Sequence, residues 1–274
     1  MRLDEIRHLL DGLRLRGERV AVHSALSSFG RVDGGAETVC QALMDSIGPE
    51  GTIVMPAFTY TETLGAEFEP NADARKVLRT AAFHPELPVS REIGAVAEAF
   101  RRLPGVLRSN HPTHSFCAWG RDARAMLSTQ RDNNLLGPLK KLNVMRGQVL
   151  LVGTTLASAT AIHLAEENLR MPYLGRRTAV RINAAGYDER VVLDNVPGCS
   201  RAFLRLEEVL DSSKTFGVSL PRGTARKIPI RYLVNLATKF LEDDSAYFVC
   251  DDIECASCNT KRALLHSAAA VPGA

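Results

Sequence analysis

Apolar residues recur at helical spacing in two segments of the first fifty residues. They are Ile6, Leu9, Leu10 and Leu13 in the first, and Val39, Leu43 and Ile47 in the second. Both stripes predict amphipathic helices, the second ending near Gly48. Two short apolar segments, residues 19–23 and 52–55, read as strands that flank the second helix. A strand, loop, helix and strand in this order form a βαβ crossover, which indicates an α/β protein.

The rest of the chain continues this alternation. Helical patterns cover residues 93–102, 121–127, 232–242 and 261–269; strand patterns cover 149–152, 179–183, 190–193, 216–230 and 246–250, and Ser200 begins a further helix. Residues 60–92 lack periodicity and read as a long functional loop. Without repeats or low-complexity linkers, we expect one domain over residues 1–274, with a cysteine-containing extension from about 250 to 274.

Composition narrows the function classes. The formal net charge is only +3, the basic residues are scattered and aromatic residues make up 6% of the chain, which argues against a nucleic-acid partner. Apolar runs stay far below the roughly 20 residues of a membrane span, so no membrane partner is expected. The N-terminal segment does not resemble a secretory signal, and we expect a cytoplasmic protein, as a monomer or a homodimer.

The segment QVLLVGTTLASATAIHLAEENLR contains the first candidate site. A buried strand ends at Gly153, and a helix follows on which His163, Glu166, Glu167 and Arg170 share one face. A histidine at the start of this helix, with carboxylates one turn later, suits acid–base chemistry. Taken alone, the same face is more often a solvated helix surface.

Two further segments carry polar groups that suit an anion. The loop after the first strand offers Ser24, Ser27 and Ser28 with flexible Gly30 ahead of a helix, where backbone N–H groups bind phosphates. It matches neither common phosphate-loop motif, so a structural turn is an equal alternative. In RSNHPTHSF, Arg108 and Ser109 could hold a phosphate.

Cysteines gather near the C-terminus. Cys255 and Cys258 have the C-x2-C spacing of half a zinc site, with Cys250 and His266 as conceivable further ligands, whereas Cys199 looks isolated. Because a second spaced pair is missing, we predict reduced thiols and no bound metal, with a zinc site at Cys250, Cys255 and Cys258 as the alternative.

Three segments in order resemble one known family. They are VHSALSSFGRVDGGAETVCQALMDSIGPEGTIVMPAFTY, LRSNHPTHSFCAWG and LLVGTTLASATAIHLAEE, within a similarity over about residues 4–250. This combination strongly resembles the aminoglycoside 3-N-acetyltransferase family, also called antibiotic N-acetyltransferases. The resemblance implies an α/β/α sandwich with a central mixed sheet, distinct from GCN5-type acetyltransferases, and transfer of an acetyl group from acetyl-CoA to an amine of an aminoglycoside.

The resemblance also implies roles for individual residues. The expected CoA-binding residues are Ser24, Leu26, Ser27, Ser28, Phe29 and Gly30 in the first segment and Arg108, Ser109, Thr113 and Ser115 in the second. His163 matches the general base and Glu166 its partner on the helix, while Asp194 is the alternative carboxylate for orienting the imidazole. For the cationic amine we expect contacts from Tyr60, Asp73 and Glu167.

Three alternatives stay open at this point. The chain could acylate another amine, such as an amino sugar or a nucleotide amine, because its overall charge is mildly basic. It could be a hydrolase with Ser158, His163 and Asp194 as a triad, although it lacks a G-x-S-x-G elbow. It could also be a zinc-stabilised binding module without catalysis.

Overall fold

A seven-stranded mixed sheet forms the centre of the fold. The computed structural model describes residues 1–59 and 82–269, and its strand order is β3-β4-β2-β1-β5-β9-β8. β1 (Arg19–Ser24) lies between β2 (Thr52–Pro56) and β5 (Gln148–Val152) and pairs in parallel with both. All three strands are predominantly apolar and buried, as expected for strands covered on both faces. The predicted βαβ crossover is therefore present.

Antiparallel strands extend this parallel centre on both sides. β9 (Gly223–Pro229) pairs with β5, and β8 (Phe216–Leu220) follows it at the edge, in agreement with the strand pattern over 216–230. On the other side lie β4 (Phe116–Gly120) and the short edge strand β3 (Leu107–Arg108). The sequence pattern did not predict these two strands; β3, with two residues, is too short to show an alternation.

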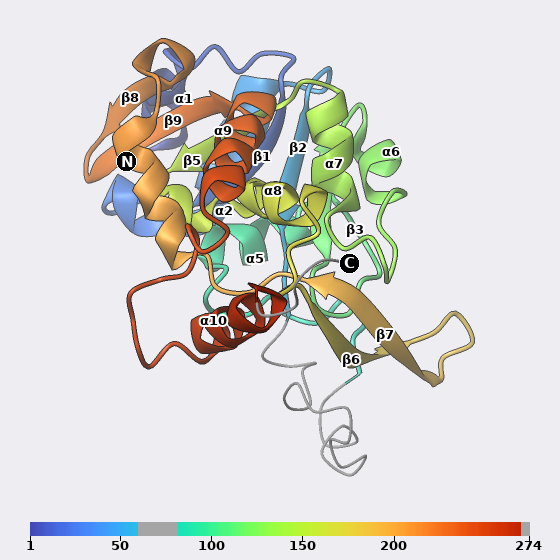
Figure 1. Ribbon diagram of the computed structural model, residues 1–274. Coiled ribbons are helices and arrows are strands. Elements are labelled where there is room, and N and C mark those ends of the chain that lie inside the picture. Colours follow the sequence, from blue (N-terminus) through green and yellow to red (C-terminus); the bar gives the residue numbers. More distant parts are fainter. Residues whose placement is uncertain (60–81, 270–274) are drawn as a thin grey trace.

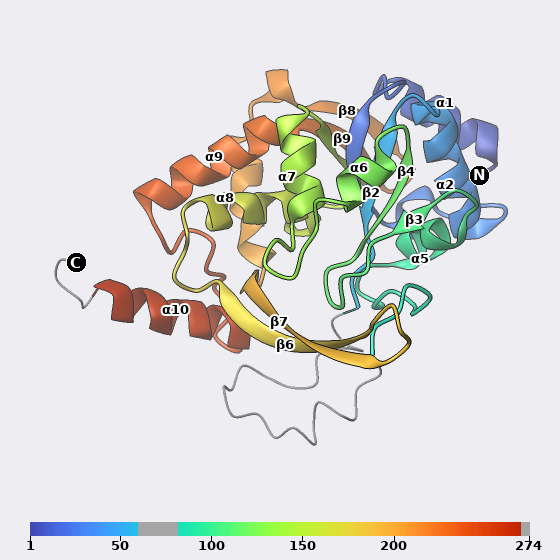
Figure 2. The same cartoon turned by 90° about the vertical axis from the view of Figure 1, so that its right-hand side faces the viewer.

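Helices cover both faces of the sheet, and Figure 2 shows the strands between the two helical layers. In β1, Val20 and Val22 join one apolar cluster, and Ala21 joins the other. The first cluster includes α1 (Leu3–Asp11), α2 (Gly35–Ile47) and α5 (Ala95–Arg102). The second includes α6 (Ala123–Leu127), α7 (Gly137–Val144), α8 (His163–Asn168) and α9 (Ile230–Asp243). The expected α/β/α sandwich is confirmed.

A two-stranded hairpin and a last helix lie at one end of the molecule (Figure 1). The hairpin consists of β6 (Gly175–Ile182) and β7 (Asp188–Val196), longer than predicted but turned at Gly186 as expected. The last helix is α10 (Ala256–Ala269). The remaining elements are 3-10 helices: η1 (Leu26–Phe29), η2 (Leu156–Ser158), η3 (Thr160–Ile162), η4 (Arg201–Val209) and η5 (Ser212–Lys214).

Near the C-terminus one predicted element is wrong, and the predicted last helix is present but longer than expected. The segment 246–250 is not a strand but a turn, in which Tyr247 N–H donates to the Asp244 carbonyl and Val249 N–H to the Ala246 carbonyl. Its apolar residues reflect burial of Phe248 and Val249 rather than pairing in a sheet. The last helix begins at Ala256, five residues before the predicted start at Lys261.

The part of the chain that the structure describes contains no helix long and apolar enough to cross a membrane.

Candidate active site

A cavity of about 580 Å³ opens at the carboxyl ends of the three parallel strands. Its walls include His23 and Ser24 from β1, Met55 and Pro56 from β2, and the segment after β5. Ligands of open α/β sheets bind at this edge, because the loops that leave the strands there diverge. Further walls come from the loop before α5, the segment after β7 and the start of α10: Ile93, Gly94, Pro197, Gly198, Cys199, Ser200 and Ser257.

The loops after β1 and β5 approach each other closely at Gly153. This residue has φ +68°, and a Cβ atom on it would lie 2.1 Å from Cβ of Ser28. Only glycine fits here, because other residues disfavour a positive φ and carry a Cβ atom that would clash with Ser28. The glycine thus allows the two loops to form one wall of the cavity.

His163, which lines the cavity, forms a close pair with Glu166. Nδ1 of His163 is 2.5 Å from Oε2 of Glu166, and both side chains are buried. Their spacing of three residues on α8 places them on the same face, as the sequence predicted. The interpretation of that face as solvated is wrong for these two residues. His163 lines the cavity, so its other ring nitrogen, Nε2, is the one available to a ligand.

Three groups hold the fully buried Glu166 carboxylate. Besides His163, Tyr173 donates from its hydroxyl at 3.1 Å, and Lys261 donates from Nζ at 2.7 Å. Burial alone would raise the pKa of Glu166, but the opposing attraction of His163 and Lys261 lowers that pKa to about 2. An ionised carboxylate only accepts hydrogen bonds, so Nδ1 of His163 is the donor in this pair.

The other predicted carboxylates do not contact His163. Asp194 lies on β7, where its Oδ1 accepts from Nε of Arg176 at 2.7 Å. Glu167 pairs with Lys140 at 2.5 Å and does not line the cavity. In the structure Glu166 contacts the imidazole, whereas Asp194, the alternative carboxylate, pairs with Arg176 instead. The Ser158–His163–Asp194 triad is not assembled either, although Ser158 lines the cavity.

Of the six predicted CoA-binding residues in the first loop, Ser24 lines the cavity. Within the described residues, Ser24 Oγ and the neighbouring His23 Nε2 are buried without a hydrogen-bond partner, so both can bond to a ligand. Phe29 instead belongs to the apolar core, Leu26 packs against it, and Ser28 Oγ donates to the Ala25 carbonyl at 2.7 Å. Ser27 is exposed, and Gly30 follows with φ +69° at the end of η1.

The polar side chains of the second predicted CoA-binding segment form hydrogen bonds within the protein. Arg108 donates to the carbonyls of Pro85, Leu87 and Ala57 and to Ser115 Oγ. Ser115 Oγ in turn donates to the Ala57 carbonyl, while Ser109 Oγ bonds the backbone of Phe116 and Thr113 Oγ1 bonds His114. None of these four side chains lines the cavity. The phosphate site predicted at Arg108 is therefore wrong, because its guanidinium joins β3 to neighbouring loops.

Two predicted substrate-binding residues, Tyr60 and Asp73, lie outside the described residues.

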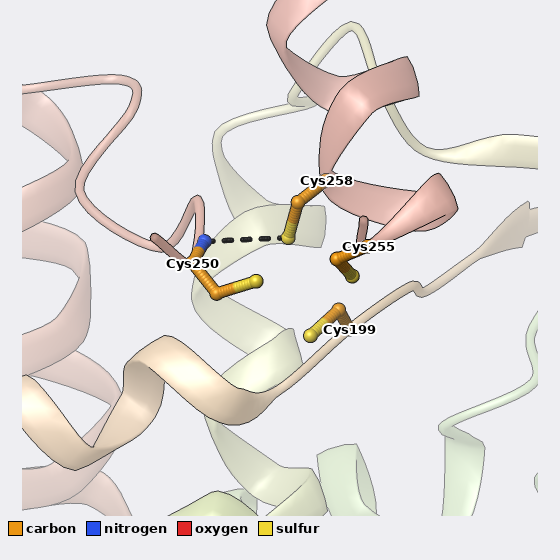
Figure 3. Close-up of side chains that lie close together, drawn as sticks. All are labelled: Cys199, Cys250, Cys255 and Cys258. Carbon is orange, nitrogen blue, oxygen red and sulfur yellow. Dashed lines mark hydrogen bonds between the residues drawn. The ribbon is translucent and has the colours of Figure 1, made fainter. Parts of the chain in front are cut away.

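The three candidate cysteines lie together in the structure, but Cys199 and His266 are not placed as the sequence suggested. Cys250, Cys255 and Cys258 come together with Cys199, and the four sulfur atoms lie within 4.8 Å of one another (Figure 3). His266 is not part of this cluster: its Nδ1 bonds the Arg262 carbonyl on the exposed side of α10. Sequence spacing could not indicate Cys199, which precedes Cys250 by 51 residues.

Lys261, like Tyr173, holds Glu166 and was not predicted from the sequence. It is 2% exposed and follows its partner Glu166 by 95 residues. A lysine in a C-terminal helix gives no signal of burial, since most lysines are exposed.

Comparison with known proteins agrees with this architecture. Residues 21–242 match the family model described as aminoglycoside 3-N-acetyltransferase. The prophage-derived aminoglycoside N(3')-acetyltransferase-like protein YokD of Bacillus subtilis is 40% identical over 167 residues, which is 58% of this chain and 61% of YokD. Aminoglycoside N(3)-acetyltransferase VII of Streptomyces paromomycinus is 31% identical over 221 residues, with 76% of this chain and 71% of that protein covered.

Solved structures show the same fold. The crystal structure of YokD superposes with a TM-score of 0.79 at 30% identity, covering 89% of this chain and 94% of YokD. A histidine-to-alanine mutant of AAC(3)-IVa in complex with a gentamicin also has a TM-score of 0.79, at 26% identity, covering 96% of this chain and 97% of that enzyme. The family model covers most of the chain, and the structural match extends over nearly all of it. The chain belongs to the aminoglycoside 3-N-acetyltransferase family.

Proposed function

We propose that the protein transfers the acetyl group of acetyl-CoA to an amino group of an aminoglycoside, with His163 as general base and the amine attacking the thioester directly. The observation that carries this proposal is the His163–Glu166 pair, 2.5 Å apart, at the wall of the cavity that ends the parallel strands. Family membership supports acetyl-CoA as the acetyl donor and position 3 as the site of transfer.

The chemistry requires a base. An alkylamine has a pKa near that of lysine, about 10.4, so it arrives protonated and cannot attack a carbonyl carbon. The ammonium first gives up one proton to water, which frees the lone pair of the nitrogen. His163 then accepts a second proton at Nε2 while the new C–N bond forms and the C–S bond of the thioester breaks. The leaving thiolate takes up the proton held by His163, so that the products are an amide, CoA and the one proton released to water. This sequence needs no covalent bond to the enzyme.

Glu166 keeps His163 in the state that this step needs. Its carboxylate accepts from Nδ1, which leaves the lone pair on Nε2, and it stabilises the imidazolium that forms when Nε2 takes the proton. Tyr173 and Lys261 hold the carboxylate from the other oxygen, so it cannot turn away from the ring. Glu166 is thus a positioning residue in this mechanism.

The developing negative charge on the thioester oxygen needs hydrogen-bond donors. Hydroxyl groups that line the cavity near His163 can supply them, and the candidates are Ser24, Thr154, Ser158 and Thr160. Ser24 is the strongest of these, because its buried Oγ has no hydrogen-bond partner among the described residues.

Thiol release tests the proposal directly. Purified protein with acetyl-CoA and gentamicin-, kanamycin- or apramycin-type compounds should release CoA, detected with a chromogenic disulfide, and NMR of the product should show acetylation at position 3. A His163→Ala variant should lose this activity. No release with any compound of the panel would reject the aminoglycoside as substrate.

One observation favours a second amine class. A polycationic drug would be expected to meet several carboxylates, yet Glu92 is the only carboxylate among the described residues that line the cavity. A less cationic acceptor, such as an amino sugar or a nucleotide amine, would fit this wall. Thiol release with such amines but with no aminoglycoside would select this second candidate.

A further inference from the structure

The four clustered cysteines have the geometry of a closed metal site. Cys199 precedes η4, Cys250 follows the turn after α9, and Cys255 and Cys258 lie at the start of α10 (Figure 3). A tetrahedral zinc ion with Zn–S bonds of about 2.3 Å places its sulfur ligands about 3.8 Å apart. The observed sulfurs lie within 4.8 Å of one another, so a small movement of the side chains brings all four to one ion.

Hydrogen bonds and charges around the cluster also suit bound thiolates. Cys258 Sγ accepts from the Cys250 N–H at 3.3 Å, and Cys199 Sγ accepts from the Arg201 N–H at 3.4 Å. Four thiolates with one divalent ion carry a net charge of −2. Arg262, which donates to the Cys250 carbonyl, lies close enough to offset part of it. Lys261 also approaches, donating to the Cys199 carbonyl at 3.3 Å, but its charge is balanced by Glu166.

Apolar packing explains little of how α10 is held. Of residues 256–268, only Cys258 and Lys261 are buried. The apolar cluster around this helix is small, with Ala202, Val249 and two of the cysteines as its buried members. Isolated helices of this length are marginal in water, and helices in proteins draw most of their stability from a buried apolar face. A helix that lacks such a face requires another anchor, and a metal ion supplies one.

We propose that Cys199, Cys250, Cys255 and Cys258 bind one structural zinc ion, and that this ion anchors α10 so that Lys261 meets Glu166. Lys261 follows Cys258 by three residues, so both project from one face of the helix. The segment with Cys199 fits tightly there: the Cys199 N–H donates to Ser257 Oγ at 2.9 Å, and a Cβ on Gly198 would lie 2.4 Å from that oxygen.

The proposed metal site adjoins the cavity. Cys199 and Ser257 both line it, and Lys261 reaches from the metal-bearing helix to the carboxylate that holds His163. All four positions around the ion are taken by protein, so it offers no open position to a substrate and acts through structure. The zinc site stands by itself; its consequence for catalysis rests on the function proposed above.

Metal analysis tests the site without any activity measurement. Protein purified under reducing conditions should contain about one zinc per chain by elemental mass spectrometry, and little iron. After removal of zinc and addition of Co²⁺, it should show the thiolate-to-cobalt charge-transfer and visible bands of a tetrahedral sulfur site. Cys255→Ala, at a half-buried position, should lose both signals. Cys40→Ala, which removes a cysteine from α2, should keep them.

Four outcomes would overturn the zinc site. They are a reduced protein that neither contains nor takes up zinc or cobalt, a chromophore with bound iron, intramolecular disulfides among these cysteines in the native mass, and a Cys255→Ala variant with full zinc content.

The link to the active site needs its own measurements. Removal of zinc should speed amide hydrogen exchange in α10 and leave that in α2 unchanged. Lys261→Met should retain zinc but lower kcat about tenfold with little change in KM, and Lys261→Arg should recover most of it. Wild-type kcat in Lys261→Met would refute the link and leave the zinc site standing. Absence of acetyl transfer to every amine would refute the proposed function, while the metal analysis would remain valid.

Discussion

Nδ1 of His163 lies 2.5 Å from Oε2 of Glu166, and the other oxygen of that carboxylate, Oε1, is 2.7 Å from Nζ of Lys261. A buried carboxylate thus joins a histidine at the cavity wall to a lysine on the last helix. Its pKa of about 2 keeps it ionised across the neutral range, where it accepts from both partners. This arrangement makes the charge of Glu166 important for both stability and turnover.

Replacing His163 should remove catalysis but not the fold. A positioned general base contributes about a hundred- to ten-thousand-fold to a rate, so His163→Ala should lower kcat by that range. Steady-state thiol release measures it, and circular dichroism checks the fold. His8→Ala, at an exposed position on α1, is the matched control. Full turnover in His163→Ala would exclude His163 as the base.

Glu166→Gln should destabilise the protein strongly. The variant leaves the Lys261 ammonium buried without its counter-charge, which costs about 3–5 kcal/mol of unfolding free energy. Urea unfolding measures the loss. Glu167→Gln, which breaks a more exposed pair with Lys140, should cost no more than about 1 kcal/mol. The double variant Glu166→Gln/Lys261→Met should recover part of the loss; a double variant no more stable than Glu166→Gln would contradict the buried-charge explanation.

Arg108→Met should affect stability rather than binding of acetyl-CoA. The guanidinium bonds three backbone carbonyls and Ser115, and its loss leaves these acceptors unsatisfied at a cost of about 3 kcal/mol. The midpoint of urea unfolding should fall, while KM for acetyl-CoA in the remaining folded protein stays within about twofold of wild type. A large rise in KM at unchanged stability would restore the phosphate-binding interpretation.

Two buried histidines should make the protein sensitive to mild acid. Burial lowers the pKa of His23 to about 4, and burial with the nearby Arg181 lowers that of His111 to about 3. In the unfolded chain both titrate near 6.5. Below pH 6.5 the unfolded state therefore binds protons that the folded state does not, so stability falls as pH falls, until the folded pKa values are reached.

Urea unfolding between pH 7 and pH 4.5 measures this effect. Each histidine should remove about 3 kcal/mol by pH 4.5, since each pH unit below 6.5 is worth about 1.4 kcal/mol. His111→Asn retains a short polar side chain without the titration and should make the dependence on pH less steep. An unchanged slope in this variant would show that His111 is accessible to protons in the folded state.

The sequence predicts the local features of this protein better than its long-range contacts. The stripes of Ile6 and Leu10 and of Val39 and Leu43 predict α1 and α2 correctly, because the period of a buried helical face is written in consecutive residues. The His163–Glu166 face was found in the same way, since both residues lie within one turn. The motifs of the three segments, which are also local, identify the family.

Only the tertiary structure decides which distant groups meet. Lys261 contacts Glu166, which precedes it by 95 residues, and Cys199 lies beside three cysteines that follow it by more than 50 residues. Arg108 donates its hydrogen bonds to backbone carbonyls, which any residue could provide. Every residue has a backbone carbonyl, so the sequence does not indicate which carbonyl a side chain bonds. The partner of a side chain across the fold depends on how the helices and strands pack. For the same reason, the sequence does not distinguish Asp194 from Glu166, whereas in the fold β7 places Asp194 beside Arg176. The base can thus be predicted from the helix that carries it, whereas the groups that hold it in place emerge only when α8, η4 and α10 come together.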